Sequence, residues 1–151
     1  MNNTIHSSDD FEGMRKAGNL AASTLDLLVE KVKPGVSTEE LDNIAFDYIV
    51  RHGGLIAPLF YKGYPKSVCT SINHVICHGI PSSRILENGD IVNIDVTVIV
   101  DGWHGDTSRM FPVGKINAKA QKLIDCTFHA MHEGINAAQP DATLGDIAVS
   151  Y

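Results

Sequence analysis

An alternating apolar run that ends in a tight-turn dipeptide constrains the fold of this chain more than any other feature. Between Asp90 and Val100, apolar residues recur at every second position, which is the period of a β-strand with one buried face. Asp101-Gly102 follows, and this dipeptide favours a type I′ hairpin turn because both of its central residues need positive φ. The sequence therefore predicts a β-hairpin whose second strand begins at Trp103.

The register of this hairpin brings two carboxylates together. With the turn at Asp101-Gly102, Thr97 lies opposite Asp106. Asp95 lies opposite Ser108, so Asp95 and Asp106 are diagonal neighbours on one face, roughly 7–8 Å apart at the backbone. Two ionised carboxylates about 4–5 Å apart repel by about 3–4 kcal/mol at an effective dielectric near 20. We therefore expect a raised carboxyl pKa or a bound cation, and paired divalent metals serve hydrolysis.

Length and composition predict one globular domain of an ordinary kind. The chain has 151 residues, 44% of them hydrophobic and 20% charged, and its net charge of −6 argues against a nucleic-acid-binding surface. No apolar run is long enough to span a membrane, and the polar, acidic start does not resemble a signal peptide. The three cysteines form no C-x-x-C pair, which is typical of free thiols in a reducing cytoplasm.

Helices are predicted on both sides of the hairpin. Ser8-Asp9-Asp10 can cap a first helix, and Ser37-x-x-Glu40 is a capping box that opens a second. Short strands are expected at 68–72 and 75–77, and a third helix over 118–138. The expected inward stripe of the first helix is Phe11, Met14, Ala17, Ala21, Leu25, Leu28 and Val32. That of the third helix is Leu123, Ile124, Thr127, Met131 and Ile135.

The end of the chain repeats the layout of its beginning. In both places a long helix is followed by a proline turn and a capped helix. Pro34 corresponds to Pro140 and Ser37 to Thr143, both at an offset of 106 positions. An internal duplication explains this layout economically, although two helical hairpins that share a common turn chemistry would look the same.

Three motifs then identify a family resemblance. Cys77-His78-Gly79-Ile80-Pro81, Asn93-Ile94-Asp95-Val96-Thr97 and His104-Gly105-Asp106-Thr107-Ser108 occur in this order, with the two aspartates eleven positions apart. In these motifs, and over nearly the whole chain from about Phe11, the sequence resembles type I (bacterial-type) methionine aminopeptidases. The resemblance implies the "pita-bread" α/β (α+β) fold, which has two pseudo-symmetric halves. It divides this chain into a polar segment 1–10, a first half 11–114 and the incomplete start of the second half, 115–151.

The resemblance also implies a site. Asp95 would bind one of two divalent metal ions (Mn, Fe, Co or Zn), and Asp106 would bridge both. His78 would be catalytic, contacting the substrate and orienting the scissile amide. Pocket positions for the methionine side chain would be Tyr61, Tyr64 and Cys69, and the backbone carbonyls around Asn73 and Val75 would hold a monovalent cation. His104 shares the face of Asp95 and is either a neighbour that supports the metal ligands or an exposed strand residue.

The implied activity is removal of the initiator methionine from nascent polypeptides by hydrolysis of the first peptide bond, with transient contact with the ribosome. Members of the family take a further His and two Glu metal ligands from the second half. No residue after Asp106 matches these, including His129, His132 and Glu133. We therefore expect residues 1–151 alone to bind divalent metal weakly and to be inactive as a peptidase.

Two other functions remain open. The first is a truncated, catalytically silent pita-bread module that acts as a binding protein, although such modules usually lose the carboxylates kept here. The second is a proline-specific exopeptidase, a class that usually carries a large extra N-terminal domain. That class also lacks the Tyr-x-Gly-Tyr-Pro-Lys-Ser sequence found here at 61–67.

Overall fold

The computed structural model describes residues 5–150. The chain divides into two compact units, Met1–Lys115 and Ile116–Tyr151, and each is described by itself. Within the described residues, no helix has the length and apolar character that crossing a membrane requires.

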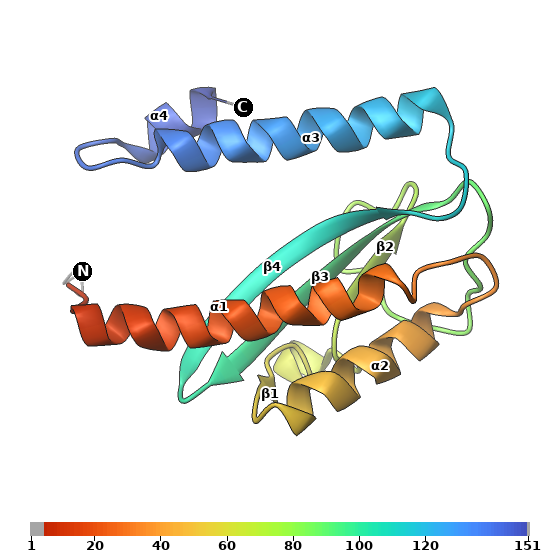
Figure 1. Ribbon diagram of the computed structural model, residues 1–151, viewed down its shortest axis with the longest axis horizontal. Helices are drawn as coiled ribbons and strands as arrows, with labels where there is room; N and C mark the ends of the chain where they lie inside the picture. The colour runs from red at the N-terminus through yellow and green to blue at the C-terminus, as the bar shows by residue number, and fades with distance from the viewer. Residues whose placement is uncertain (1–4, 151) are drawn as a thin grey trace. The chain divides into compact units, whose positions relative to one another are not determined.

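An antiparallel sheet forms the centre of the first unit (Figure 1). Strands β3 (Ile91–Val100) and β4 (Trp103–Pro112) make the predicted hairpin, with Thr97 opposite Asp106 and Asp95 opposite Ser108. The turn residues have φ of 50° and 85°, as the type I′ turn requires. On its other edge β3 pairs with β2 (Cys69–Ile72) and with the short β1 (Leu55–Ile56), which the sequence did not predict. The register prediction is confirmed.

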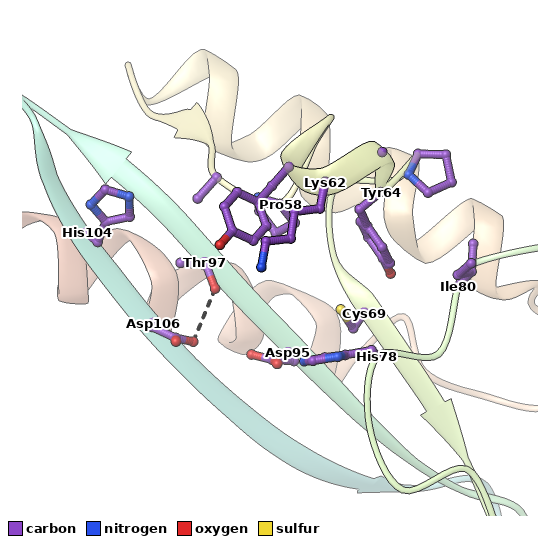
Figure 2. Close-up of a pocket in the computed structure, with 14 residues that line it drawn as sticks. Pro58, Lys62, Tyr64, Cys69, His78, Ile80, Asp95, Thr97, His104 and Asp106 are labelled. Atoms are coloured by element: carbon purple, nitrogen blue, oxygen red, sulfur yellow. Dashed lines mark hydrogen bonds between the residues drawn. The ribbon is translucent and has the colours of Figure 1, made fainter.

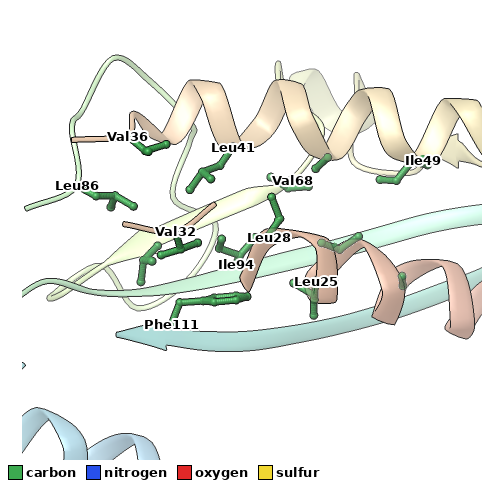
Figure 3. Packing of buried hydrophobic residues seen from close by; sticks show 14 of the residues in the cluster. Leu25, Leu28, Val32, Val36, Leu41, Ile49, Val68, Leu86, Ile94 and Phe111 are labelled. Atoms are coloured by element: carbon green, nitrogen blue, oxygen red, sulfur yellow. The ribbon is translucent and has the colours of Figure 1, made fainter. Parts of the chain in front are cut away.

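Two helices cover one face of this sheet. Helix α1 (Ser8–Val29) is capped by Ser7, one residue before the predicted cap, and α2 (Thr38–Arg51) is capped by Ser37. The alternating apolar side chains of β3 pack against both helices in a single core (Figure 3). Its largest fully buried members include Leu25, Leu28, Leu41, Ile49, Leu86, Ile94 and Val96. Because the apolar face of β3 points to the helices, its other face is free to carry the polar side chains.

Glycine allows α1 to approach β4 closely. A Cβ atom added to Gly105 would collide with the backbone of Ala17 and Gly18 in α1. Gly105 lies between His104 and Asp106, whose side chains point to the opposite face of the sheet. The close packing therefore fixes the distance of β4 from α1 at these two residues. Close helix–sheet packing therefore requires glycine at this position of the His-Gly-Asp motif, whatever chemistry the neighbouring residues perform.

Two details of the sequence interpretation are wrong in this unit. Phe11 and Met14 belong to the predicted inward stripe but are about half exposed. The neighbouring Gly13 packs against Trp103 at the turn end of the hairpin, so the first turns of α1 lie at the end of the sheet. The predicted strand 75–77 is an irregular loop, since Asn73 adopts a φ of 52° that turns the chain away from β3.

The second unit is a helical hairpin of α3 (Ala118–Ala137) and α4 (Leu144–Val149). Thr143 caps α4 through the amide of Asp146, as Ser37 caps α2 through that of Glu40. The predicted inward stripe of α3 is wrong as stated. Leu123, Thr127, Met131 and Ile135 are exposed, and Gly134 is the buried residue of this helix. Among residues 116–150, the six-residue α4 is the one helix that packs against α3, so most of the apolar stripe of α3 has no partner in this described part of the unit.

Candidate active site

A pocket of about 860 Å³ opens on the face of the sheet that the helices leave free. One wall is the loop from Ala57 to Pro65, and another is the segment of His78 and Ile80. The floor is formed by side chains of β2, β3 and β4 (Figure 2). All six residues that the sequence singled out for chemistry or substrate binding line this pocket: Tyr61, Tyr64, Cys69, His78, Asp95 and Asp106.

The two aspartates project into the pocket from adjacent strands (Figure 2). Burial is the main cause that raises the pKa of Asp95, and the neighbouring carboxylate of Asp106 raises it further. The charge of His78 acts in the opposite direction. Thr97 Oγ1 donates a hydrogen bond of 3.2 Å to Asp106 Oδ1 and so fixes the orientation of that carboxylate. The hairpin therefore holds two acidic groups in an arrangement that penalises their joint ionisation when no cation is present.

Backbone geometry places His78 beside these carboxylates. His78 has a φ of 54°, in the left-handed region. The next residue is held against β2, because Gly79 accepts a 2.8 Å hydrogen bond from the Thr70 amide and donates one of 3.2 Å to Ser71 Oγ. A Cβ atom at Gly79 would collide with the Thr70 carbonyl, so only glycine allows this approach. The imidazole of His78 then lies next to Asp95 (Figure 2).

Tyr64 and Cys69 are the more buried of the residues expected to bind the methionine side chain. The Tyr64 hydroxyl lies 3.0 Å from the Val68 carbonyl and 3.2 Å from the Gly79 carbonyl, and its one proton is shared between these two acceptors. Burial is the main cause that raises the pKa of Tyr64. Cys69 lies opposite Asp95 in the β2–β3 register, and burial raises the pKa of its thiol. Tyr61, by contrast, is largely exposed at the mouth of the pocket.

Three other residues of the pocket, Pro58, Lys62 and Ile80, were missed by the sequence interpretation. His104, which the sequence placed on the face of Asp95, lines the pocket as well. The wall 57–65 has no periodic pattern that could have indicated it, and Lys62 adopts a φ of 49° that sequence statistics disfavour. Asn73 does not line the pocket, and its side chain instead bonds Asp90 Oδ1 at 2.8 Å and the Ile91 amide at 3.0 Å.

The donor set partly fits a divalent metal site. One of the two carboxylates has a raised pKa, so a cation between them would stabilise their ionised forms. Oxygen ligands suit divalent ions. Within residues 5–150, however, no group of three or more His, Cys, Asp or Glu side chains is arranged to hold a metal ion. A metal ion held by the aspartate pair would therefore need ligands beyond these two carboxylates.

Comparison with known proteins finds relatives at high sequence identity. The chain is 57% identical over 143 residues to the methionine aminopeptidase of Rickettsia prowazekii (strain Madrid E), covering 95% of this chain and 55% of that protein. It is 50% identical over 149 residues to the methionine aminopeptidase of Escherichia coli (strain K12), covering 97% and 56%. The chain therefore spans little more than half the length of these relatives.

A solved structure and a family model agree with these relatives. The crystal structure of the Rickettsia prowazekii methionine aminopeptidase superposes with a TM-score of 0.96 at 55% identity, covering 97% of this chain and 59% of that one. The expected fold class, the first half of the α+β pita-bread aminopeptidase fold, is confirmed. The model of "Metallopeptidase family M24" matches residues 12–150. On this match and these identities, the chain belongs to metallopeptidase family M24.

Proposed function

We propose that this chain is part of a methionyl aminopeptidase, which removes the initiator methionine from nascent polypeptides by hydrolysing their first peptide bond. The observation that carries this proposal is the Asp95–Asp106 pair, which lies in one pocket with His78 and includes a carboxyl of raised pKa. Perturbed acidic pairs in a cleft are typical of catalytic and metal sites. The methionine aminopeptidases named above support the choice of substrate.

In this proposal Asp95 and Asp106 hold divalent metal ions, two in the complete site, of which Mn, Fe, Co and Zn are the candidates. When bound, the metals would polarise the scissile carbonyl and allow hydrolysis near neutral pH. Thr97 orients the Asp106 carboxylate through its hydroxyl. The ligands that are absent from residues 5–150 would come from a second half of the protein.

The remaining pocket residues would position the substrate. His78 lies beside Asp95 and is the group that would contact the scissile amide. Tyr64 and Cys69 contribute to the mainly apolar lining of the pocket, which suits an unbranched thioether side chain. Tyr61 at the mouth would close over the methionine. A monovalent cation on the carbonyls near Asn73 and Val75 remains part of the proposal, separate from this pocket.

The biological setting follows from the proposed activity. The substrates would be the N-termini of nascent chains in the cytoplasm, met near the ribosome. The boundaries proposed for the complete protein are a first half at 11–114 and the beginning of a second at 115–151. No observation favours the silent binding module, because both carboxylates and His78 still line one pocket.

Metal binding by the 151-residue chain tests the site directly. Calorimetric titration with Mn²⁺ or Co²⁺ should show weak binding that Asp106→Asn abolishes. Asp101→Asn is the matched control, since Asp101 lies in the turn of the same hairpin and is absent from the pocket lining. Equal binding by all three proteins would refute the assignment of Asp106.

Methionine release tests the activity. The chain alone, with Mn²⁺ or Co²⁺ and a Met-Ala-Ser peptide, should release no methionine. Mixing it with a polypeptide that covers the rest of the Rickettsia relative should restore release, and Asp106→Asn should prevent this. Turnover by the chain alone that Asp106→Asn removes would mean that the site is completed in another way, for example by a second copy. A folded, metal-binding complex of the two polypeptides that releases no methionine would contradict the proposed function.

A further inference from the structure

A buried carboxylate outside the pocket is bonded to the backbone that joins the pocket wall 57–65 to β2. Asp42 lies on α2 and is only 4% exposed. Its Oδ1 accepts hydrogen bonds from the backbone amides of Ser67 at 2.7 Å and Val68 at 3.1 Å, and Lys66 Nζ lies 3.9 Å from its Oδ2. A buried charge is tolerated when it is hydrogen-bonded in this way, and bonds from amides to an ionised group are among the stronger ones.

These contacts continue into the pocket. Val68 donates its amide to Asp42, and its carbonyl accepts a hydrogen bond of 3.0 Å from the Tyr64 hydroxyl. The same hydroxyl lies 3.2 Å from the carbonyl of Gly79, the residue after His78. Gly79 is held in turn by the Thr70 amide at 2.8 Å. An unbroken series of hydrogen bonds therefore runs from α2 through the pocket wall to the segment that carries His78.

We propose that Asp42 is a positioning residue of this site. It fixes the Ser67–Val68 backbone, and through the Tyr64 hydroxyl it sets the position of His78. His78 has a left-handed φ and depends on its neighbours to keep that conformation. Loss of the Asp42 carboxylate would release Val68, weaken the acceptor geometry at Tyr64 and let the His78 segment move away from Asp95. The inference rests on the proposed function only in treating His78 as a substrate-binding residue. The series of hydrogen bonds itself does not depend on catalysis.

Three variants separate this role from a general contribution to stability. Asp42→Ala removes both acceptor oxygens, whereas Asp42→Asn keeps one that can still accept the two amides. Asp90→Ala is the matched control. Asp90 is also a buried carboxylate that accepts a backbone amide, from Glu87 at 2.9 Å, beside a basic residue, Arg84 at 3.2 Å. It accepts Asn73 Nδ2 at 2.8 Å as well, but it does not line the pocket.

The readouts are amide hydrogen exchange and the imidazole NMR signals of His78, measured on the isotope-labelled 151-residue chain. Asp42→Ala should speed exchange at Ser67, Val68 and Thr70 by about tenfold beyond any change in global unfolding, and it should shift the His78 signals. Asp42→Asn should keep amide exchange and the His78 signals close to those of the unmodified chain. Asp90→Ala should leave Thr70 and His78 unchanged apart from global effects. Uniformly faster exchange with unmoved His78 signals would show a purely structural role and overturn the proposal.

A second variant keeps the inference testable if Asp42→Ala does not fold. Tyr64→Phe removes the hydroxyl between Val68 and Gly79 and leaves the Asp42 contacts in place. It should shift the His78 signals and speed Thr70 exchange while Ser67 stays protected. Where Asp42→Ala folds, its double variant with Tyr64→Phe should shift the His78 signals by less than the sum of the two single shifts, because the two changes act on one series of bonds. Unmoved His78 signals in Tyr64→Phe would overturn the proposal, whether or not the chain binds metal or releases methionine.

Discussion

Thr97 Oγ1 donates a hydrogen bond of 3.2 Å to Asp106 Oδ1 from the directly opposite position of the β3–β4 ladder. The hairpin thus supplies both a candidate metal ligand and the group that orients it. Groups that orient metal-binding carboxylates affect metal affinity although they do not touch the metal. The bond is exposed at the pocket floor, so its contribution to folding is small.

Replacing this hydroxyl should therefore affect metal binding more than stability. We expect Thr97→Val to weaken Mn²⁺ binding about tenfold and to change the unfolding free energy by less than about 1 kcal/mol. Calorimetry and urea unfolding measure the two effects. Thr107→Val is the control, since Thr107 pairs with Val96 on the opposite face of the same hairpin. Equal affinities for Thr97→Val and the unmodified chain would contradict the orienting role.

The raised pKa of Asp95 has a consequence for stability without metal. Because the folded-state pKa lies above the ordinary value of 3.8, the unfolded chain loses this proton first as the pH rises. The group therefore destabilises the fold progressively from about pH 3.8 up to its folded pKa, and this loss persists at neutral pH. Below pH 3.8 the carboxyl is protonated in both states and makes no such contribution.

Asp95→Asn should consequently stabilise the metal-free chain at pH 7, and its advantage should shrink as the pH falls toward 3.5. Thermal unfolding of both proteins in the presence of a chelator measures this difference, and groups common to both cancel. Asp101→Asn, in the turn, provides the comparison at an exposed aspartate. A variant less stable than the unmodified chain at pH 7 would show that the Asp95 carboxylate is favourably bound in the folded state.

The hairpin and its carboxylate pair could be predicted from the sequence because two local signals agree. The apolar period fixes which face of β3 is buried, and Asp101-Gly102 fixes the register. The diagonal relation of Asp95 to Asp106 follows from those two facts alone.

The pocket wall could not be predicted in this way. Phe60 and Lys62 have positive φ without being glycine, a conformation that contacts from distant residues must hold. The apolar side chains of 75–77 predict a strand, but Ile76 is 94% exposed and pairs with no strand. Apolar character predicts burial only where a partner surface exists.

The apolar stripe of α3 illustrates the same limit and leads to a prediction. Leu123, Met131 and Ile135 are exposed, although their spacing is that of a buried helix face. We expect the chain to bind a hydrophobic dye and to self-associate at high concentration. Replacing all three residues by Gln should reduce both effects, as measured by dye fluorescence and light scattering. The same replacement at exposed Leu144 and Val149 of α4 is the comparison. An equal reduction in dye binding and self-association there would show that these effects are not specific to the α3 stripe.

The contact between α1 and β4 gives a prediction in which two glycines should behave oppositely. A Cβ atom at Gly105 would collide with the backbone of Ala17, and neither backbone can move without disturbing the helix–sheet packing. Gly105→Ala should therefore lower the unfolding free energy by about 1–3 kcal/mol and, because Asp106 is the next residue, weaken metal binding as well.

Gly18 lies in α1 itself with open space around its Cβ position. Gly18→Ala should raise stability by about 0.5–1 kcal/mol, since alanine is the better helix former and meets no obstacle. Urea unfolding of the two variants measures both signs, and a stabilising Gly105→Ala would show that the helix and the hairpin are not packed as closely as described.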